Sequence, residues 1–342
     1  MVPRLAVLVV VMLLVPFGLR LIDARYGADD RHPSYLPSLE AFRARDPFDP
    51  FHRHHIARLR PELVILGDSM AGTRIDPAVL AELSGKRVYT LLQAASGPAF
   101  WYLAIKNWII PSGAAPKYVF VFFRDTNLTD VMFRLDETYR AHLDRAAHDS
   151  EGELDALVGA RRGAIRSRAT SAVEAAYGAN RTRNWMVPAV GDRVARIIEP
   201  GRRRRQAFVV EMNVRLDYRH MRPVVAADID AVADRDADFD RFIDRSVLPL
   251  MIRDAQQAGI TLFFVRVQRR PDGGRPPRQS EALARYVARL REYVQAAGAL
   301  WRDDTGDAAM TIDLYGDGDH LARDARPRYT GLFWNRVRPL LQ

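Results

Sequence analysis

The chain has 342 residues, of which 48% are hydrophobic and 27% are charged. This composition supports a substantial core and excludes both a disordered chain and a polytopic membrane protein. The absence of cysteine excludes disulfides, a thiol nucleophile and metal sites built on thiolates. The net charge is +9, but lysine occurs only at 86, 106 and 117. We attribute this arginine skew to coding bias and, with no zinc-finger, KH or RRM pattern, expect no nucleic-acid partner.

The chain begins with an apolar run at 5–19, which Leu21 and Ile22 continue and arginines flank on both sides. Its length approaches that of a membrane-spanning helix, and no small-residue cleavage site follows it. Residues 1–22 are therefore predicted to form an uncleaved signal-anchor. The protein would be a single-pass protein of the inner membrane with its domain on the periplasmic, extracytoplasmic side. A cleaved signal peptide and a buried N-terminal helix are the alternatives.

Residues 23–60 are polar and punctuated by proline, which predicts a juxtamembrane linker with little regular structure. His52, His54 and His55 are grouped within it. Histidine is a common metal ligand, but no second group of ligands follows at a suitable spacing. We therefore expect no metal site here.

Strand and helix patterns alternate from residue 61 to residue 130. Short, continuous apolar runs predict strands buried on both faces at 63–66 and 118–123, and a further strand is predicted between them at 88–92. Helices are predicted between them, at 76–84 and 99–110. The first of these has Asp76 as its N-cap and Pro77 at its first helical position. This alternation is typical of right-handed βαβ units in an open parallel sheet.

The alternation is interrupted at 131–240 and resumes over 241–342. The interrupting segment is rich in charge, mostly helical in composition, and carries four arginines at 202–205. We interpret it as an insertion. It would serve either as a lid or docking surface for a polymer or membrane partner, or only as additional solvent-exposed helices without a role in the site. The remaining elements are helices at 243–258, 279–297 and 330–340 and strands at 260–267 and near 299–301. The fold predicted is one α/β domain in two halves, split by a helical insertion.

Ligands of open parallel sheets bind outside the carboxyl ends of the strands. The first strand is followed by Gly-Asp-Ser at 67–69, the second by Gly97 and the third by Asn127. A Gly- and Asp-rich loop near the C-terminus contains Asp317 and His320. A serine on a sharp strand-to-helix turn needs a base to act as a nucleophile, and His320 is the candidate. Asp317 is spaced to hold the imidazole in one tautomer.

These residues resemble the four sequence blocks of the SGNH/GDSL hydrolase superfamily. The resemblance covers both predicted halves of the domain and not the insertion. It implies a three-layer, flavodoxin-like α/β sandwich around a five-stranded parallel sheet, in agreement with the strands predicted above. It also implies that Ser69 is the nucleophile, that His320 is the general base and that Asp317 orients it. The oxyanion hole would consist of the Ser69 and Gly97 backbone N–H groups and the Asn127 side chain, with no cofactor.

The third block departs from the family pattern. That pattern is usually Gly-x-Asn-Asp, whereas residues 125–128 read Asp-Thr-Asn-Leu. Arg124 and Asp125 are therefore alternative candidates to line the site. Arg124 would either contact an anionic group of the substrate or pair with Asp130.

With an anchor added, the architecture resembles cell-surface members that act in O-acetylation or D-alanylation of bacterial envelope polymers. We therefore expect a serine esterase or O-acyltransferase that forms an acyl-serine on the way to a cell-envelope glycan or exopolysaccharide. Its partners would be an acylated glycan or acyl donor and a membrane-bound acyltransferase. The alternatives are a simple carboxylesterase or lipase and a non-catalytic glycan-binding or assembly protein. Trp101, Tyr102 and Trp108 are expected to pack in the core rather than to stack on sugar.

Overall fold

The structure is a computed structural model. It describes Val10, Leu14 and residues 48–135, 139–148, 151–162, 237–271, 278–316 and 319–341. The chain divides into two compact units, Met1–Asp46 with Arg162–Ala207 and Pro47–Arg161 with Phe208–Gln342. The sheet and the helices that cover it belong to the second unit. Apart from Val10 and Leu14, the predicted membrane segment 1–22 lies outside the described residues, as do the arginines at 202–205. Within the described ranges, no helix is both long enough and apolar enough to span a membrane.

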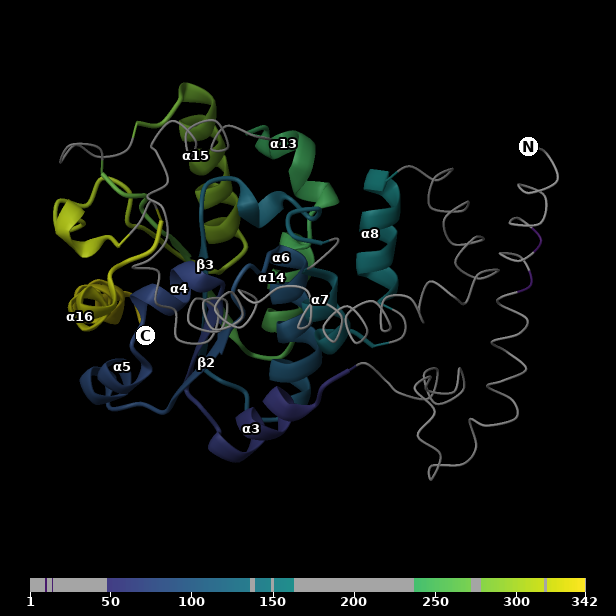
Figure 1. Ribbon diagram of the computed structural model, residues 1–342, viewed down its shortest axis with the longest axis horizontal. Helices are drawn as coiled ribbons and strands as arrows, with labels where there is room; N and C mark the ends of the chain where they lie inside the picture. The colour runs from purple at the N-terminus through teal and green to yellow at the C-terminus, as the bar shows by residue number, and fades with distance from the viewer. Residues whose placement is uncertain are drawn as a thin grey trace. The chain divides into compact units, whose positions relative to one another are not determined.

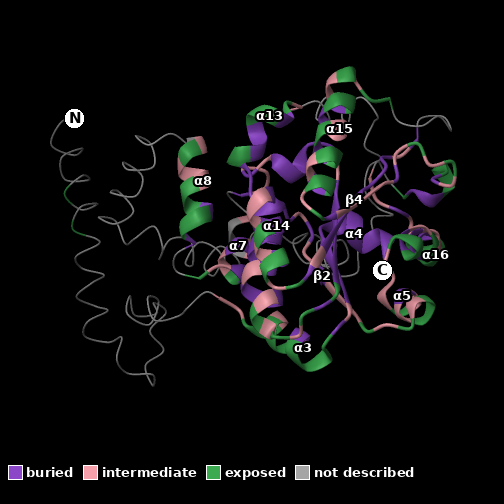
Figure 2. Ribbon diagram, turned by 180° about the vertical axis from the view of Figure 1, so that it is seen from behind, coloured by how far each residue is buried: buried purple, intermediate pink, exposed green. Residues whose placement is uncertain are grey.

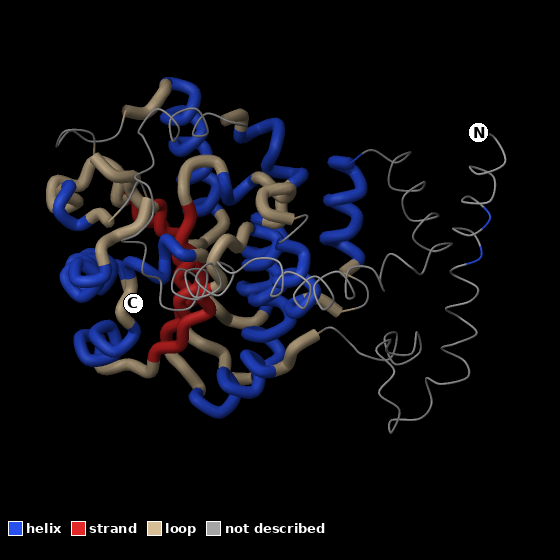
Figure 3. The backbone as a smooth tube through the Cα atoms, viewed as in Figure 1, coloured by secondary structure: helices blue, strands red, loops and turns tan. Residues whose placement is uncertain are grey.

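A five-stranded sheet forms the centre of this unit (Figure 3). Its strands are β1 (Leu63–Gly67), β2 (Val88–Leu92), β3 (Tyr118–Phe123), β4 (Thr261–Arg266) and β5 (Leu300–Asp303). They lie in the order β2-β1-β3-β4-β5, and every pairing is parallel. The predicted α/β fold and all five predicted strands are confirmed. The strand order reverses between β1 and β3, where parallel sheets of this order bind their ligands.

Helices cover both faces of the sheet, which makes three layers (Figure 1). Along β1, Val64 and Leu66 face one hydrophobic cluster, and Leu63 and Ile65 face the other. The first cluster is covered by α3 (Phe51–Leu59), α6 (Pro98–Leu103), α14 (Leu248–Gln257) and α15 (Glu281–Ala296). The second is covered by α4 (Ser69–Arg74), α5 (Pro77–Ser84) and α16 (Arg326–Val337). Figure 2 shows buried strands between helices whose outer faces are exposed, and the edge strands β2 and β5 are mostly half-buried. Since β1 and β3 are buried on both faces, their sequences are continuous apolar runs rather than alternating ones.

The helix ends follow local capping chemistry. The α5 prediction is confirmed, because Asp76 caps the helix through its carboxylate and Pro77 is its first residue. The predicted helix at 99–110 begins at Pro98 as α6 and continues as a π-helical turn, η1 (Ala104–Ile109). The predicted helix at 243–258 starts later, at α14. A 3-10 turn, η5 (Ile243–Arg245), precedes it, and the Ser246 hydroxyl accepts from the first N–H of α14.

The expectation of an irregular linker across 23–60 is wrong for residues 51–59, which form α3. Ile56 is fully buried in the first cluster. The Trp108 indole N–H donates to the Asp49 carbonyl at 2.8 Å, and His52 Nδ1 lies 2.9 Å from the Tyr89 hydroxyl. These contacts with residues distant in sequence hold the helix against the domain. Its own sequence is mostly polar and buries a single residue, which is why the local pattern did not predict it.

The first part of the predicted insertion packs on the same unit. It contains α7 (Arg140–Ala146) and α8 (Gly152–Arg162). Between them, the buried Glu151 accepts from Lys106 Nζ at 2.7 Å and from Asn107 Nδ2 at 2.7 Å. Burial by itself raises the pKa of Glu151. Hydrogen bonds from Lys106, the His148 N–H and Asn107 outweigh burial and lower that pKa below its ordinary value. A partly buried ion pair, with Glu151 as its buried member, therefore joins this segment to the helical stretch after β2.

Candidate functional site

The first element of the site is the turn between β1 and α4. Gly67 ends the strand, and an added Cβ there would lie 2.6 Å from the Ala71 Cβ, so the turn requires glycine. Asp68 caps α4 by accepting from the Met70 N–H at 2.8 Å. Ser69 is thereby held as the first residue of α4, at the carboxyl end of β1. This is the position the sequence predicted for a nucleophile.

His320 meets Ser69 from the opposite end of the chain. Its Nε2 lies 2.9 Å from Ser69 Oγ, although the two residues are 251 positions apart. The histidine loop is closed on itself by the Gly316 N–H, which donates to the His320 carbonyl at 2.9 Å. Serine and histidine are therefore in the contact that a nucleophile and its base require. Asp317, predicted to orient the imidazole, lies outside the described residues.

Arg74, at the end of α4, links the serine helix to the histidine loop. Its side chain is fully buried. Nη1 donates to the Asp319 carbonyl at 2.9 Å, and Nη2 donates to the Gln268 carbonyl at 2.8 Å. The guanidinium also lies 6.0 Å and 5.8 Å from the ring centroids of Tyr315 and Tyr329. Sequence reasoning missed this residue, because an arginine in a polar-looking helix gives no sign that it is buried.

A second arginine holds the same loop from the end of β3. Arg124 pairs with the carboxylates of Asp319 and Asp125. The partner considered from the sequence is a different residue, Asp130. Burial by itself lowers the pKa of Arg124, but these carboxylates outweigh it and raise that pKa above its ordinary value. With two acidic neighbours, Arg124 serves to anchor the loop that carries His320. This position leaves it less suited to receive an anionic substrate.

The loops after β2 and β3 bring the other two predicted residues to this edge of the sheet. The Gln93 N–H donates to the Gly67 carbonyl at 3.1 Å, which ties the start of the β2 loop to the serine turn. Gly97 is the N-cap of α6. Asn127 is the buried first residue of the 3-10 turn η3 (Asn127–Thr129). Within the described ranges, no protein oxygen accepts from the Ser69 or Gly97 N–H or from the side-chain amide of Asn127.

The departure in the third block has a structural counterpart. Asp125 occupies the position of the family's glycine and has φ 48°, in the left-handed region. Aspartate tolerates this conformation better than most side chains do. Its buried carboxylate lies 3.4 Å from Arg266 Nη2, within an ion-pair cluster below the turn. Asp125 therefore supports the turn that presents Asn127.

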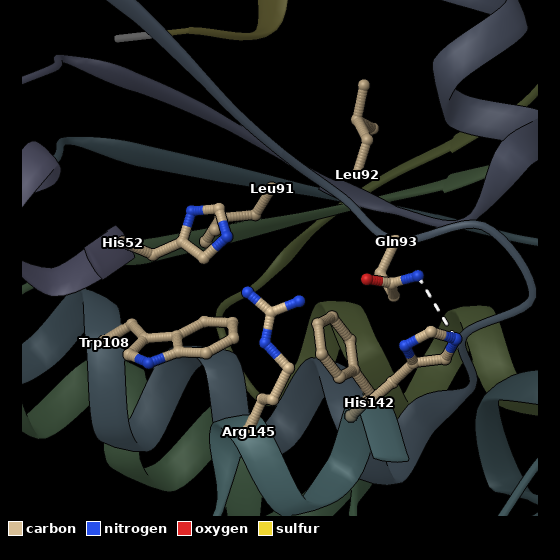
Figure 4. Close-up of a pocket in the computed structure, with 8 residues that line it drawn as sticks. His52, Leu91, Leu92, Gln93, Trp108, His142 and Arg145 are labelled. Atoms are coloured by element: carbon tan, nitrogen blue, oxygen red, sulfur yellow. Dashed lines mark hydrogen bonds between the residues drawn. The ribbon is translucent and has the colours of Figure 1, made fainter. Parts of the chain in front are cut away.

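A separate small cavity lies beside β2 on the face covered by α3 and α6 (Figure 4). His52, Trp108, His142 and Arg145 contribute to its lining, and its volume is about 20 Å³, room for about one water molecule. Burial lowers the pKa of both histidines below the ordinary value. The cavity is too small for an ester or a sugar. Trp101, Tyr102 and Trp108 are all buried, which confirms the prediction that they pack in the core.

The described residues contain no group of three or more histidine, aspartate or glutamate side chains arranged to hold a metal ion. No family model and no curated protein matches the chain. Two solved structures have some similarity to it. A "putative acylhydrolase" from Bacteroides fragilis is 10% identical, with a TM-score of 0.38, over 84% of this chain and 95% of that one. A "putative arylesterase" from Agrobacterium tumefaciens is 16% identical, with a TM-score of 0.30, over 82% of this chain and 100% of that one. At these scores neither similarity bears on the activity, which must be inferred from the site itself.

Proposed function

We propose that the chain is a serine esterase or O-acyltransferase of the SGNH type, with Ser69 as nucleophile and His320 as general base. The observation that carries this proposal is the 2.9 Å contact between Ser69 Oγ and His320 Nε2. It lies at the carboxyl end of the sheet, beside the point where the strand order reverses. A histidine in contact with a serine on a tight strand-to-helix turn is the arrangement that activates a hydroxyl at neutral pH.

The reaction follows from these groups. Ser69 Oγ attacks the ester carbonyl carbon while His320 Nε2 takes the hydroxyl proton. The negative charge that develops on the carbonyl oxygen is stabilised by the N–H groups of Ser69 and Gly97 and by the Asn127 amide. The bond to the leaving alcohol then breaks, and His320 returns the proton to that alcohol. Water or an acceptor hydroxyl attacks the resulting acyl-serine while His320 accepts its proton. The bond between the acyl carbon and Ser69 Oγ then breaks, and His320 returns the proton to Oγ, which regenerates Ser69.

The proposal extends to the setting of the reaction. An N-terminal signal-anchor would hold the domain on the extracytoplasmic face of the inner membrane. There the acyl group would pass to a cell-envelope glycan or exopolysaccharide, with a membrane-bound acyltransferase supplying it. Supporting this are the apolar run at 5–19 and the resemblance of the whole architecture, with an anchor added, to cell-surface members of the superfamily that acylate envelope polymers. A simple carboxylesterase or lipase would use the same site with water as the only acceptor.

Active-site labelling tests the proposal. The full-length protein, purified in detergent, is treated with a fluorophosphonate probe and assayed with p-nitrophenyl acetate. Ser69→Ala should abolish labelling, and Ser69→Ala or His320→Ala should lower kcat by roughly 10⁴–10⁶-fold. Ser84→Ala, at the end of α5, is the matched control and should label like the wild type. An unlabelled, inactive wild-type protein that still binds glycan would instead identify a non-catalytic binding protein.

Transfer and hydrolysis are separated by adding an acceptor. The wild-type protein is incubated with p-nitrophenyl acetate and an unacetylated envelope glycan, and the glycan is analysed by mass spectrometry. Acetyl groups that appear on the glycan, and not with Ser69→Ala, support the transferase. Release of acetate alone, at a rate that the glycan does not change, supports the esterase.

A further inference from the structure

The short segment 131–135, which follows the third sequence block, lies against both loops that carry backbone donors of the proposed oxyanion hole. Arg134 Nη1 donates to Asp68 Oδ2 at 2.7 Å and to the Ser96 carbonyl at 3.0 Å. Asp68 immediately precedes Ser69, and Ser96 immediately precedes Gly97. One guanidinium nitrogen therefore bonds both loops at the residue before each proposed donor.

The backbone of this segment is fitted to the same loop. A Cβ added at Gly97 would lie 2.3 Å from the Phe133 carbonyl oxygen, so Gly97 is glycine because residue 133 packs on it. The Phe133 N–H donates to the Asp130 carbonyl at 3.0 Å, which closes a turn. Arg134 follows with φ 57°, and its guanidinium lies 4.7 Å from the centroid of the Phe133 ring. Backbone conformation and ring contact together direct the guanidinium toward the two loops.

Charge gives Arg134 a second role. Asp68 is 1% exposed, and its other carboxylate oxygen accepts from the Met70 N–H. Without a cation, this buried carboxylate would lie one residue from the point where negative charge develops on the substrate. Like charges at short distance oppose each other strongly in a buried site. Arg134 neutralises Asp68 and leaves the other carboxylate oxygen of Asp68 free to cap α4 through the Met70 N–H.

We propose that Arg134 is a positioning residue that holds the Ser69 and Gly97 N–H groups in register for the oxyanion and neutralises Asp68 beside it. This inference rests on the proposed function. It also makes the beginning of the segment predicted as an insertion part of the active site. The side chain is 26% exposed, so a small molecule can reach its place when the side chain is removed.

Chemical rescue tests the role of Arg134. In the full-length protein, Arg134→Ala should lower kcat for p-nitrophenyl acetate by about 10–100-fold, since an oxyanion donor contributes roughly 10²–10³, with KM changed by less than about threefold. Millimolar methylguanidinium should restore part of the lost kcat in Arg134→Ala and none in Ser69→Ala. Arg134→Lys, which keeps the charge and one donor, should retain more activity than Arg134→Ala. It also serves as the second variant if the alanine variant does not fold.

Arg328→Ala is the matched control, because Arg328 makes one exposed ion pair, with Asp313, at the same 2.7 Å. It should leave kcat unchanged with or without methylguanidinium. The positioning role alone would be overturned if the wild type is active and Arg134→Ala is equally active. It would also be overturned if methylguanidinium restores no activity to Arg134→Ala and Arg134→Lys is no more active than Arg134→Ala. A wild type without Ser69-dependent turnover would overturn the proposed function and this inference together.

Discussion

Replacing Arg74 with methionine tests how firmly the serine helix is attached to the histidine loop. The guanidinium donates to two carbonyls outside its own helix, those of Asp319 and Gln268. Methionine occupies much of the space of the aliphatic stem but donates no hydrogen bond. The Asp319 carbonyl would then lose this donor, whereas the Gln268 carbonyl would keep the Tyr315 hydroxyl, which donates to it at 3.0 Å. The substitution therefore removes the link while disturbing the packing little.

The size of the effect follows from those two bonds. A buried polar group left unsatisfied costs about 1–3 kcal/mol, and the Gln268 carbonyl keeps the Tyr315 hydroxyl, so the loss at the Asp319 carbonyl should cost about 1–3 kcal/mol. A typical domain has only about 5–15 kcal/mol of stability in all. Arg74→Lys, which can donate to one of the two carbonyls, should lose roughly half as much. Activity should also fall in the folded protein, because the loop that carries His320 is held to α4 by this side chain.

Urea unfolding of the full-length protein, followed by tryptophan fluorescence, measures the loss, and p-nitrophenyl acetate turnover below the transition measures the site. Arg87→Met is the matched control. Arg87 is 57% exposed and donates to one carbonyl, that of Arg60, so its loss should stay within about 0.5 kcal/mol. If Arg74→Met lowers the free energy of unfolding by no more than that amount and keeps the wild-type kcat, the hydrogen bonds of Arg74 do not hold the site together.

Three further outcomes are expected. Burial raises the pKa of Asp304 above its ordinary value and outweighs its nearby donors, so the folded state holds this proton to higher pH than the unfolded state. The free energy of unfolding should therefore fall as pH rises from about 4 through the raised pKa of Asp304. It should fall less steeply in Asp304→Asn. Free energies from urea unfolding that change with pH by the same amount in both proteins would contradict this. Gly97→Ala, which brings a Cβ onto the Phe133 carbonyl, should lower kcat at least about tenfold, whereas Gly152→Ala, with open space around it, should not. Ile56→Ala should cost about 2–5 kcal/mol by urea unfolding, and a cost near zero would mean that α3 is not part of the domain.

Much of the fold was predictable because its signals are local. The strands β1 and β3 are buried on both faces, and that burial leaves uninterrupted apolar runs in the sequence. Asp76 and Pro77 mark the start of α5 by chemistry confined to one helical turn. The placement of Ser69 at a strand end followed from the same run. Parallel topology then brought the other strand ends to the same edge of the sheet, which is why residues 69 and 320 could be paired across 251 positions.

The supporting residues could not be predicted, since their roles depend on contacts between segments distant in sequence. Nothing near Arg74 in the sequence indicates that it bonds the residue before His320. Nothing near Arg134 indicates that it bonds the residues before Ser69 and Gly97. The helix α3 buries one residue and is held by contacts with residues that are distant in sequence, such as Tyr89 against His52. By itself the sequence determined the strands, the N-cap of α5 and which side chains are proposed to react, through burial and backbone chemistry that act within a few residues. Only the tertiary structure decided which buried polar groups hold those side chains in place, because a buried donor is directed by whichever carbonyls and carboxylates the completed fold leaves around it.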